Sequence, residues 1–93
     1  MIKSFKCKET KKIFNREKSY KLPNEIQRIA MIKLWMLDAA PDIISLRNPP
    51  SNNLETLKGD RKGQYSIRIN KQYRICFRWE SGNAFDVEIV DYH

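Results

Sequence analysis

The sequence predicts an α+β domain in which two to three N-terminal helices pack on one face of an antiparallel β-sheet. In the C-terminal half, apolar and polar side chains alternate over residues 64–69 and 73–79, as they do in strands with one buried face. In the N-terminal half, apolar residues recur at intervals of three and four, which is typical of helices. The 93 residues suffice for one core, so we expect a single domain spanning residues 1–93.

The first elements are a short strand at residues 2–7 and a helix from Lys8 to about Arg16. A second helix begins near Pro23, because the N–H that proline lacks is not needed in a first helical turn. Met31 and Trp35 either pack against the first helix or leave an apolar patch. The core stripe of the second helix is predicted to comprise Ile26, Ile29, Ala30, Lys33, Leu34 and Leu37.

Pro41 is expected to start a short third helix that carries Ile43, Ile44 and Leu46. Residues 47–53, with two prolines and three asparagines, form a loop. A short strand or an extended entry segment follows at residues 54–58, and the last strand covers residues 84–90. In that last strand we expect one side in the core, comprising Phe85, Val87 and Ile89, with Asp86, Glu88 and Val90 on the other.

The central feature is the hairpin formed by residues 64–69 and 73–79, which a three-residue loop joins. Antiparallel pairing of these strands places Arg68, Arg74 and Arg78 on one polar face. Guanidinium groups gathered on a stiff sheet are suited to binding phosphate. The alternative is that they serve solubility or pair with Asp86 and Glu88.

Positive charge is concentrated at the N-terminus of a chain whose net charge is +7. Residues 1–21 hold eight Lys or Arg against two Glu, whereas residues 54–93 hold seven against six Asp or Glu. An anionic partner is therefore plausible, although a solvated lysine face is the simpler alternative.

The C-terminal residues Asp91, Tyr92 and His93 are candidates for acid–base chemistry. Continued alternation of the last strand places Tyr92 on the arginine face, and imidazole can both accept and donate a proton near neutral pH. With arginine holding the phosphate, such a set fits cleavage of RNA by its own 2′-hydroxyl. A terminal histidine is also commonly solvated and idle.

Other classes of function find less support in the sequence. The apolar runs are too short to span a bilayer, and the first residues do not resemble a signal peptide. Cys7 and Cys76 form neither a disulfide framework nor a metal-ligand spacing, so reduced thiols in a cytoplasmic protein without cofactor or metal are expected.

These motifs resemble those of HigB-type toxins in the RelE/ParE superfamily. The resemblance covers essentially the whole chain and is carried by five segments, namely 46–50, 53–55, 57–63, 66–68 and 73–77, together with the ending 88–93. It implies a ribosome-dependent mRNA endoribonuclease that acts in the cytoplasm on mRNA at the ribosomal A site. It also implies a HigA-like helix-turn-helix antitoxin, with operator DNA bound only through that antitoxin.

The resemblance also implies roles for individual residues. Arg74, Tyr92 and His93 match the family's catalytic positions, and Asp91 and Lys58 match residues that assist. Some HigB proteins carry histidine where this chain has Glu55, which could act as a base but supplies no positive charge. To these we add Arg68, Arg78 and Arg61 as RNA contacts, and as rRNA contacts Lys3, Lys6, Lys8, Lys11, Lys12 and Arg16.

Two other classes of function remain open at this point. A ParE-like inhibitor of DNA gyrase would share the fold but would have no need for Arg74 together with Asp91, Tyr92 and His93. A non-enzymatic nucleic-acid-binding module would need only the basic N-terminus.

Overall fold

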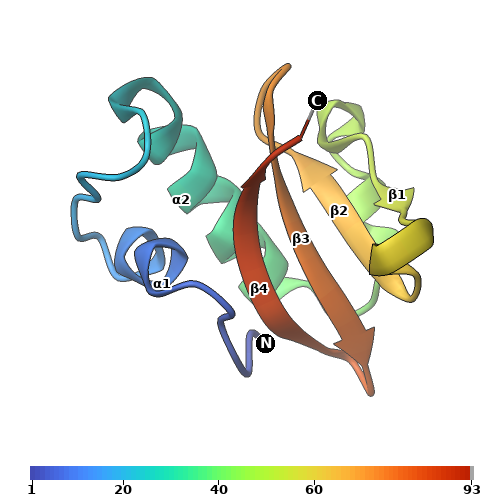
Figure 1. Cartoon of the computed structure of the whole chain (residues 1–93). Coiled ribbons are helices and arrows are strands. Elements are labelled where there is room, and N and C mark those ends of the chain that lie inside the picture. The colour runs from blue at the N-terminus through green and yellow to red at the C-terminus, as the bar shows by residue number, and fades with distance from the viewer. Residues whose placement is uncertain (93) are drawn as a thin grey trace.

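The computed structural model describes residues 1–92 and places two α-helices against a four-stranded antiparallel sheet (Figure 1). The helices are α1 (Lys8–Phe14) and α2 (Asn24–Ala39). The strands lie in the order β1 (Glu55–Thr56), β2 (Gln64–Arg68), β3 (Tyr73–Glu80) and β4 (Asn83–Asp91). Single turns of 3-10 helix, η1 (Ile44–Arg47) and η2 (Pro50–Asn52), connect α2 to β1, and a third, η3 (Gly59–Arg61), connects β1 to β2. The predicted α+β arrangement is confirmed.

The core lies between α2 and one face of the sheet. Helix α2 contributes a buried stripe of Ile26, Ala30, Leu34 and Leu37, which packs with Ile67, Ile75, Phe77 and Val87 of the strands. Ile29 was predicted to belong to this stripe, but it is 43% exposed. At about 100° per residue, Ile29 lies roughly 80° from the centre of the buried stripe, so it falls at the edge.

Trp35 was predicted either to pack against the first helix or to leave an apolar patch. It packs against the first helix. Its indole Nε1 donates a hydrogen bond to the Phe14 carbonyl at 3.0 Å, and the Arg16 guanidinium lies 4.7 Å from its ring centroid. Met31 is partly buried against the core. Trp35 therefore joins α2 to the end of α1, and neither residue leaves an apolar patch uncovered.

The expected N-terminal strand at residues 2–7 is wrong in extent. The segment is extended but makes only two isolated parallel bridges with β4, Ile2 to Ala84 and Phe5 to Val87. The chain then turns directly into α1, where the Thr10 hydroxyl accepts a hydrogen bond from the Ile89 backbone N–H at 3.0 Å. The early start of α1 thus ends the pairing before a continuous strand forms.

The third helix predicted from Pro41 is only the single turn η1. Asp42 explains the late start, because its carboxylate accepts from the Ser45 N–H at 2.8 Å and its carbonyl accepts from the Ser45 hydroxyl at 2.7 Å. This local side-chain turn replaces a first helical turn. Leu46 is buried, whereas Ile44 is 61% exposed.

A β-bulge in β4 corrects the predicted position of Phe85. Asp86 has φ +54°, and the register with β3 shifts between Cys76 and Arg78. Phe85 therefore pairs with Arg78 on the face away from the helices, while Ala84 pairs with Trp79 on the core side. An extra residue in one strand reverses the faces beyond it, which strict alternation cannot anticipate.

Two isoleucines of α2 test the position of the buried stripe. We expect Ile26→Ala to lower the free energy of unfolding by about 2–5 kcal/mol, because Ile26 is enclosed in the core. Ile29→Ala removes the same atoms from a half-exposed position, and we expect a loss of about 0.5 kcal/mol. Urea unfolding measures both, and equal losses would contradict the arrangement of α2.

Candidate functional site

The sheet face opposite the helices carries three cross-strand rows of polar residues. Residues paired directly across antiparallel strands point to the same face. One row contains Arg68, Arg74 and Val90, and the register therefore confirms that the arginines share this face. The other rows are Glu55, Ser66, Cys76 and Glu88, followed by Gln64, Arg78 and Phe85.

Arg74 is the most strongly fixed cation of this face. Its guanidinium Nε donates to the Ser66 hydroxyl at 2.7 Å, and Nη2 donates to the Asn53 carbonyl at 2.6 Å and to the Ser66 carbonyl at 3.3 Å. Only 6% of the residue is exposed. Among residues 1–92 no acceptor is found for Nη1, so one end of the guanidinium is held by protein and the other can bind an anion.

Glu55 is the accessible carboxylate beside Arg74. Its Oε1 lies 3.9 Å from Arg74 Nη2, and 44% of its side chain is exposed. This distance is too long for a hydrogen bond but short enough for attraction. The carboxylate therefore lies at the edge of the arginine site with its oxygens accessible to a ligand.

Tyr92 reaches the same place from the end of β4. The Arg74 Cζ lies 5.8 Å from the centroid of its ring, and 40% of the residue is exposed. Its backbone N–H donates to the Gln72 carbonyl at 2.6 Å, which fixes Tyr92 beside the β2–β3 loop. The expectation that Tyr92 borders the arginine face is confirmed.

Asp91 takes the opposite side of β4, because it pairs with Tyr73 of the core face. Its Oδ2 accepts a hydrogen bond from Gln72 Nε2 at 3.0 Å. The third candidate of this group, His93, lies outside the described residues. The structure thus brings Tyr92 to Arg74 and places the Asp91 carboxylate against the loop.

Arg61 forms an ion pair with Glu88, which belongs to the neighbouring row. Its Nη1 donates to Glu88 Oε1 at 2.8 Å, and this hydrogen bond raises the pKa of Arg61. Lys6 Nζ lies 3.9 Å from the same carboxylate oxygen. Cys76 in this row is fully buried, and burial raises the pKa of its thiol, so the reactive thiolate is disfavoured.

Arg78 lies apart from Arg74 although it shares its face. Four residues along a strand correspond to about 13 Å. Its guanidinium binds the Asp86 carboxylate at 2.9 Å, is paired with Glu80, and lies 5.4 Å from the ring centroid of Phe85. The hydrogen bond to Asp86 raises the pKa of Arg78. Acidic neighbours therefore neutralise this end of the sheet.

Arg68 lies next to Arg74 in its cross-strand row, whereas Lys58 lies in the connection between β1 and β2. Arg68 Nε donates to the Asn70 carbonyl at 3.0 Å, and the residue helps to line an open pocket of about 390 Å³ with Lys33 and Lys71. Lys58 is exposed just before η3. In the part of the chain that the structure describes, its side chain has no hydrogen bond or ion pair.

The acceptors that hold Arg74 were not identified from the sequence. Ser66 was placed on the polar face by alternation, but its partner could be found only from the strand register. The Asn53 acceptor is a backbone carbonyl, which has no side-chain signal at all. Its position depends on the left-handed backbone of Asn53, with φ +46°.

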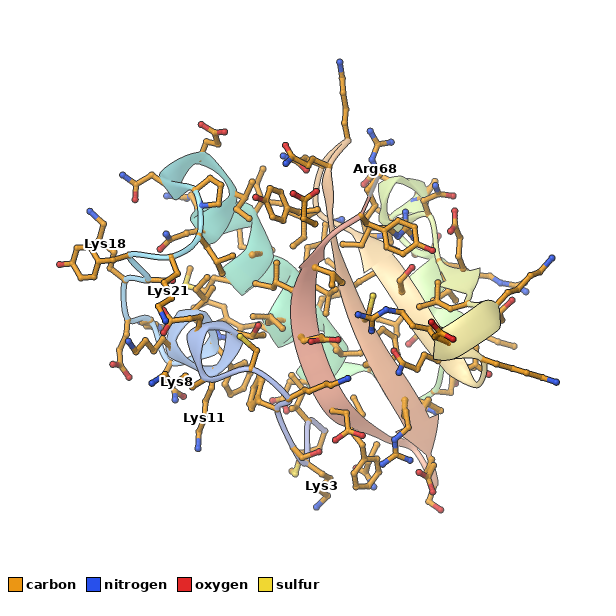
Figure 2. All side chains as sticks on the ribbon, in the orientation of Figure 1. Lys3, Lys8, Lys11, Lys18, Lys21 and Arg68 are labelled. Carbon is orange, nitrogen blue, oxygen red and sulfur yellow. The ribbon has the colours of Figure 1, made fainter. Side chains whose placement is uncertain are left out.

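The N-terminal lysines form a second basic surface on the helical side. Figure 2 shows Lys8 and Lys11 projecting from α1 away from the sheet, on another side of the molecule from Arg68. Lys3 is also exposed, whereas Lys12 is paired with Glu9 at 3.3 Å. Arg16 lies against Trp35. This basic surface, defined here by Lys3, Lys8 and Lys11, is separate from Arg74.

Residues 1–92 offer neither a metal-binding cluster nor a membrane-spanning helix. No group of three or more His, Cys, Asp or Glu side chains in that range could hold a metal ion. None of the helices in that range combines the length and apolar character needed to cross a membrane.

Comparisons with known proteins agree with this architecture. The chain is 41% identical over 87 residues to Toxin HigB-1 of Vibrio cholerae, covering 92% of each protein. It is 37% identical over 94 residues to Endoribonuclease HigB of Proteus vulgaris, covering 100% of both.

Solved structures show the same fold at low sequence identity. YafQ from E. coli strain BL21(DE3) aligns with a TM-score of 0.57 and 7% identity, over 98% of this chain and 93% of that one. A chain of the heterotetrameric YoeB–YefM toxin–antitoxin complex from Staphylococcus aureus aligns with a TM-score of 0.56 and 17% identity, over 100% and 98% respectively.

A family model settles the relationship. The model for the RelE-like toxin HigB of type II toxin–antitoxin systems matches residues 3–93. Together with the two relatives above, this match shows that the chain belongs to the HigB-like family of RelE-like toxins from type II toxin–antitoxin systems.

Proposed function

We propose that this toxin is an endoribonuclease that cleaves mRNA bound to the ribosome in the cytoplasm and so blocks translation. The observation that carries the proposal is Arg74, a buried guanidinium held by three hydrogen bonds on an open sheet face. The relative named Endoribonuclease HigB supports the reaction class. A gyrase inhibitor on this fold would have no use for a cation fixed in this way.

The proposed reaction begins with attack by the ribose 2′-oxygen on the adjacent phosphorus. A base takes the 2′-hydroxyl proton, the new P–O2′ bond forms, and the P–O5′ bond breaks as an acid protonates the leaving oxygen. The products are a 2′,3′-cyclic phosphate and a 5′-hydroxyl. Arg74 stabilises the negative charge that develops on the phosphate oxygens, using the N–H groups of Nη1.

Glu55 and the C-terminal residues supply the proton transfers in this proposal. The Glu55 carboxylate, 3.9 Å from Arg74, can accept the proton of a 2′-hydroxyl whose phosphate is bound there. The exposed Tyr92 side chain contacts Arg74 from the β4 end of the sheet and carries a phenolic O–H, and His93 remains a predicted acid–base group. Lys58 and Arg68 would bind flanking phosphates.

Ribosome dependence follows from the shallow shape of the site. Arg74, Glu55 and Tyr92 lie on an open sheet face, and none of the three lines the pocket between α1 and α2 or the open pocket beside Arg68. Alignment of the 2′-oxygen with the phosphate must then be supplied by the ribosome. Positioning of this kind can account for about 7–11 kcal/mol of a barrier.

The partner of the toxin in this proposal is a HigA-like antitoxin with a helix-turn-helix domain. One structural relative was solved within a heterotetrameric YoeB–YefM toxin–antitoxin complex, which supports an antitoxin partner. Operator DNA would be reached only through the antitoxin.

Arg74 variants test the proposed reaction. Arg74→Ala should lower the single-turnover rate of cleavage of ribosome-bound mRNA about 10²–10³-fold, because one oriented donor group is lost from the transition state. Arg74→Lys should restore only part of the rate, because an ammonium lacks the planar donor fork. Without ribosomes, the parental protein should leave the same mRNA intact.

Arg78→Ala is the matched control, since it removes the same side chain from the same strand and face. We expect a much smaller loss, because Asp86 and Glu80 already occupy that guanidinium. Circular dichroism verifies folding. Parental-rate cleavage by folded Arg74→Ala would refute the site, and loss of DNA supercoiling by gyrase instead of mRNA cleavage would favour the ParE-like alternative.

The basic surface of Lys3, Lys8 and Lys11 should set ribosome affinity rather than the chemical step. Replacing all three with Gln should reduce the slope of log affinity against log salt concentration by about 2, because fewer counterions are released on binding. The cleavage rate at saturating ribosomes should remain near the parental value. Lys62→Gln, an exposed lysine beside the sheet, serves as control, and an unchanged slope in the triple variant would show that the helical surface is merely solvated.

A further inference from the structure

The loop between η1 and β1 supplies a backbone acceptor to the proposed site. The Asn53 carbonyl receives the Arg74 Nη2 hydrogen bond at 2.6 Å. Asn53 is exposed and has a left-handed backbone, with φ +46° and ψ +56°. An exposed residue in this conformation does not hold its own carbonyl in place, so the orientation of that carbonyl must be fixed by its neighbours.

Asn52, the residue before Asn53, is fully buried, and both ends of its side-chain amide form hydrogen bonds. Its Nδ2 donates to the Leu46 carbonyl at 3.0 Å and to the Asn48 carbonyl at 3.3 Å, and it contacts Met36 Sδ at 3.2 Å. Its backbone N–H donates to the Pro49 carbonyl at 2.9 Å. One amide side chain therefore ties together both ends of the loop and the adjacent helix.

The other end of the Asn52 amide holds a buried cation. Its Oδ1 accepts a hydrogen bond from the Nζ of Lys33, a residue of α2 that is only 8% exposed. Burial lowers the pKa of Lys33, and among residues 1–92 no carboxylate forms an ion pair with it. A buried ammonium needs an acceptor, so its hydrogen bond anchors the Asn52 oxygen to α2, while the Asn52 nitrogen is anchored to the loop.

We propose that Asn52 is a positioning residue for Arg74: it anchors residues 46–53 to α2 and thereby holds the Asn53 carbonyl where Arg74 Nη2 binds it. The functional part of this inference rests on the proposed ribonuclease function. Asn52 itself contacts no part of the proposed substrate path. It acts through the backbone of the next residue and then through the Arg74 guanidinium.

The physical consequence of losing Asn52 is specific. The Ser66 hydroxyl still binds Arg74 Nε, so the guanidinium keeps its place in the sheet. Without the Asn53 carbonyl, however, Nη2 loses its 2.6 Å hydrogen bond and keeps only the 3.3 Å bond to the Ser66 carbonyl. Rotation about the Nε–Cζ bond is then less restricted, and Nη1 is aimed less precisely. The expected defect is therefore in the chemical step and not in ribosome binding.

The first test observes Arg74 directly in the ¹⁵N-labelled full-length protein by NMR. In the parental protein the Nη1 and Nη2 signals of Arg74, identified by their absence from Arg74→Lys, should be distinct because rotation is slow. Asn52→Asp keeps the shape of the side chain and an acceptor for Lys33 but removes the Nδ2 donor. We expect it to accelerate the rotation at least tenfold, so that the two signals merge.

Asn52→Ala removes both ends of the amide and should show the same effect more strongly if it folds. Asn83→Ala is the matched control and should leave the signals distinct, because Asn83 lies at the start of β4 and its exposed side-chain Nδ2 donates to the Ser81 carbonyl at 3.3 Å, far from the loop. Merged signals in the parental protein, or distinct signals in Asn52→Asp, would overturn the inference whether or not the protein cleaves RNA.

The second test measures single-turnover cleavage of ribosome-bound mRNA. Asn52→Asp should lower the rate at saturating ribosomes at least tenfold, with the half-saturating ribosome concentration unchanged. In an Arg74→Ala background the same substitution should cause no further loss, because both act through one group. Additive losses would indicate a general structural role and would overturn the inference, whereas a parental protein that cleaves no RNA would refute the proposed function and leave the NMR test decisive.

Discussion

The structure depends most on how one buried cation is satisfied. Arg74 lies mid-sheet with 6% of its surface exposed, and a guanidinium in that position is tolerable only if protein oxygens bind its N–H groups. The Ser66 hydroxyl, the Ser66 carbonyl and the Asn53 carbonyl do so. These acceptors come from β2 and from the preceding loop, so the hairpin, the loop and the helix that anchors the loop must all be in place. The N–H groups of Arg74 Nη1 are therefore oriented before a ligand binds.

The rest of the charge on this face is arranged around that cation. Glu88 is occupied by Arg61, and Asp86 and Glu80 are occupied by Arg78. Each of these pairs neutralises a carboxylate that would otherwise repel a phosphate. Glu55 is the exception, because it lies 3.9 Å from Arg74 with its side chain 44% exposed. Its negative charge opposes phosphate binding, so its value in the proposed reaction must come from accepting a proton.

Sequence alone predicted the parts of the fold that follow from periodicity. Alternation over residues 64–69 and 73–79 correctly placed Arg68, Arg74 and Arg78 on one face, because residues 64–68 pair with residues 74–78 without irregularity. The same rule misplaced Phe85, because Asp86 adopts a left-handed conformation that creates a bulge. Ile29 was misplaced because a spacing of three residues does not determine how wide the buried stripe of a helix is.

The supports of the site were harder to predict than the site itself. The sequence indicated Arg74 because it is a cation in the middle of a predicted strand. It predicted only loop positions for Asn52 and Asn53. A backbone acceptor and a buried amide depend on tertiary position and leave no pattern in one sequence.

The most direct measurement is the structure of this toxin on a ribosome whose mRNA carries a 2′-O-methyl group at the cleavage site, which prevents the reaction. The account predicts that Arg74 Nη1 lies about 2.7–2.9 Å from a non-bridging oxygen of the scissile phosphate, with the Ser66 and Asn53 contacts retained. It also predicts that Glu55 faces the blocked 2′-oxygen. A scissile phosphate bound by Arg78, or one that lies away from this sheet face, would contradict it.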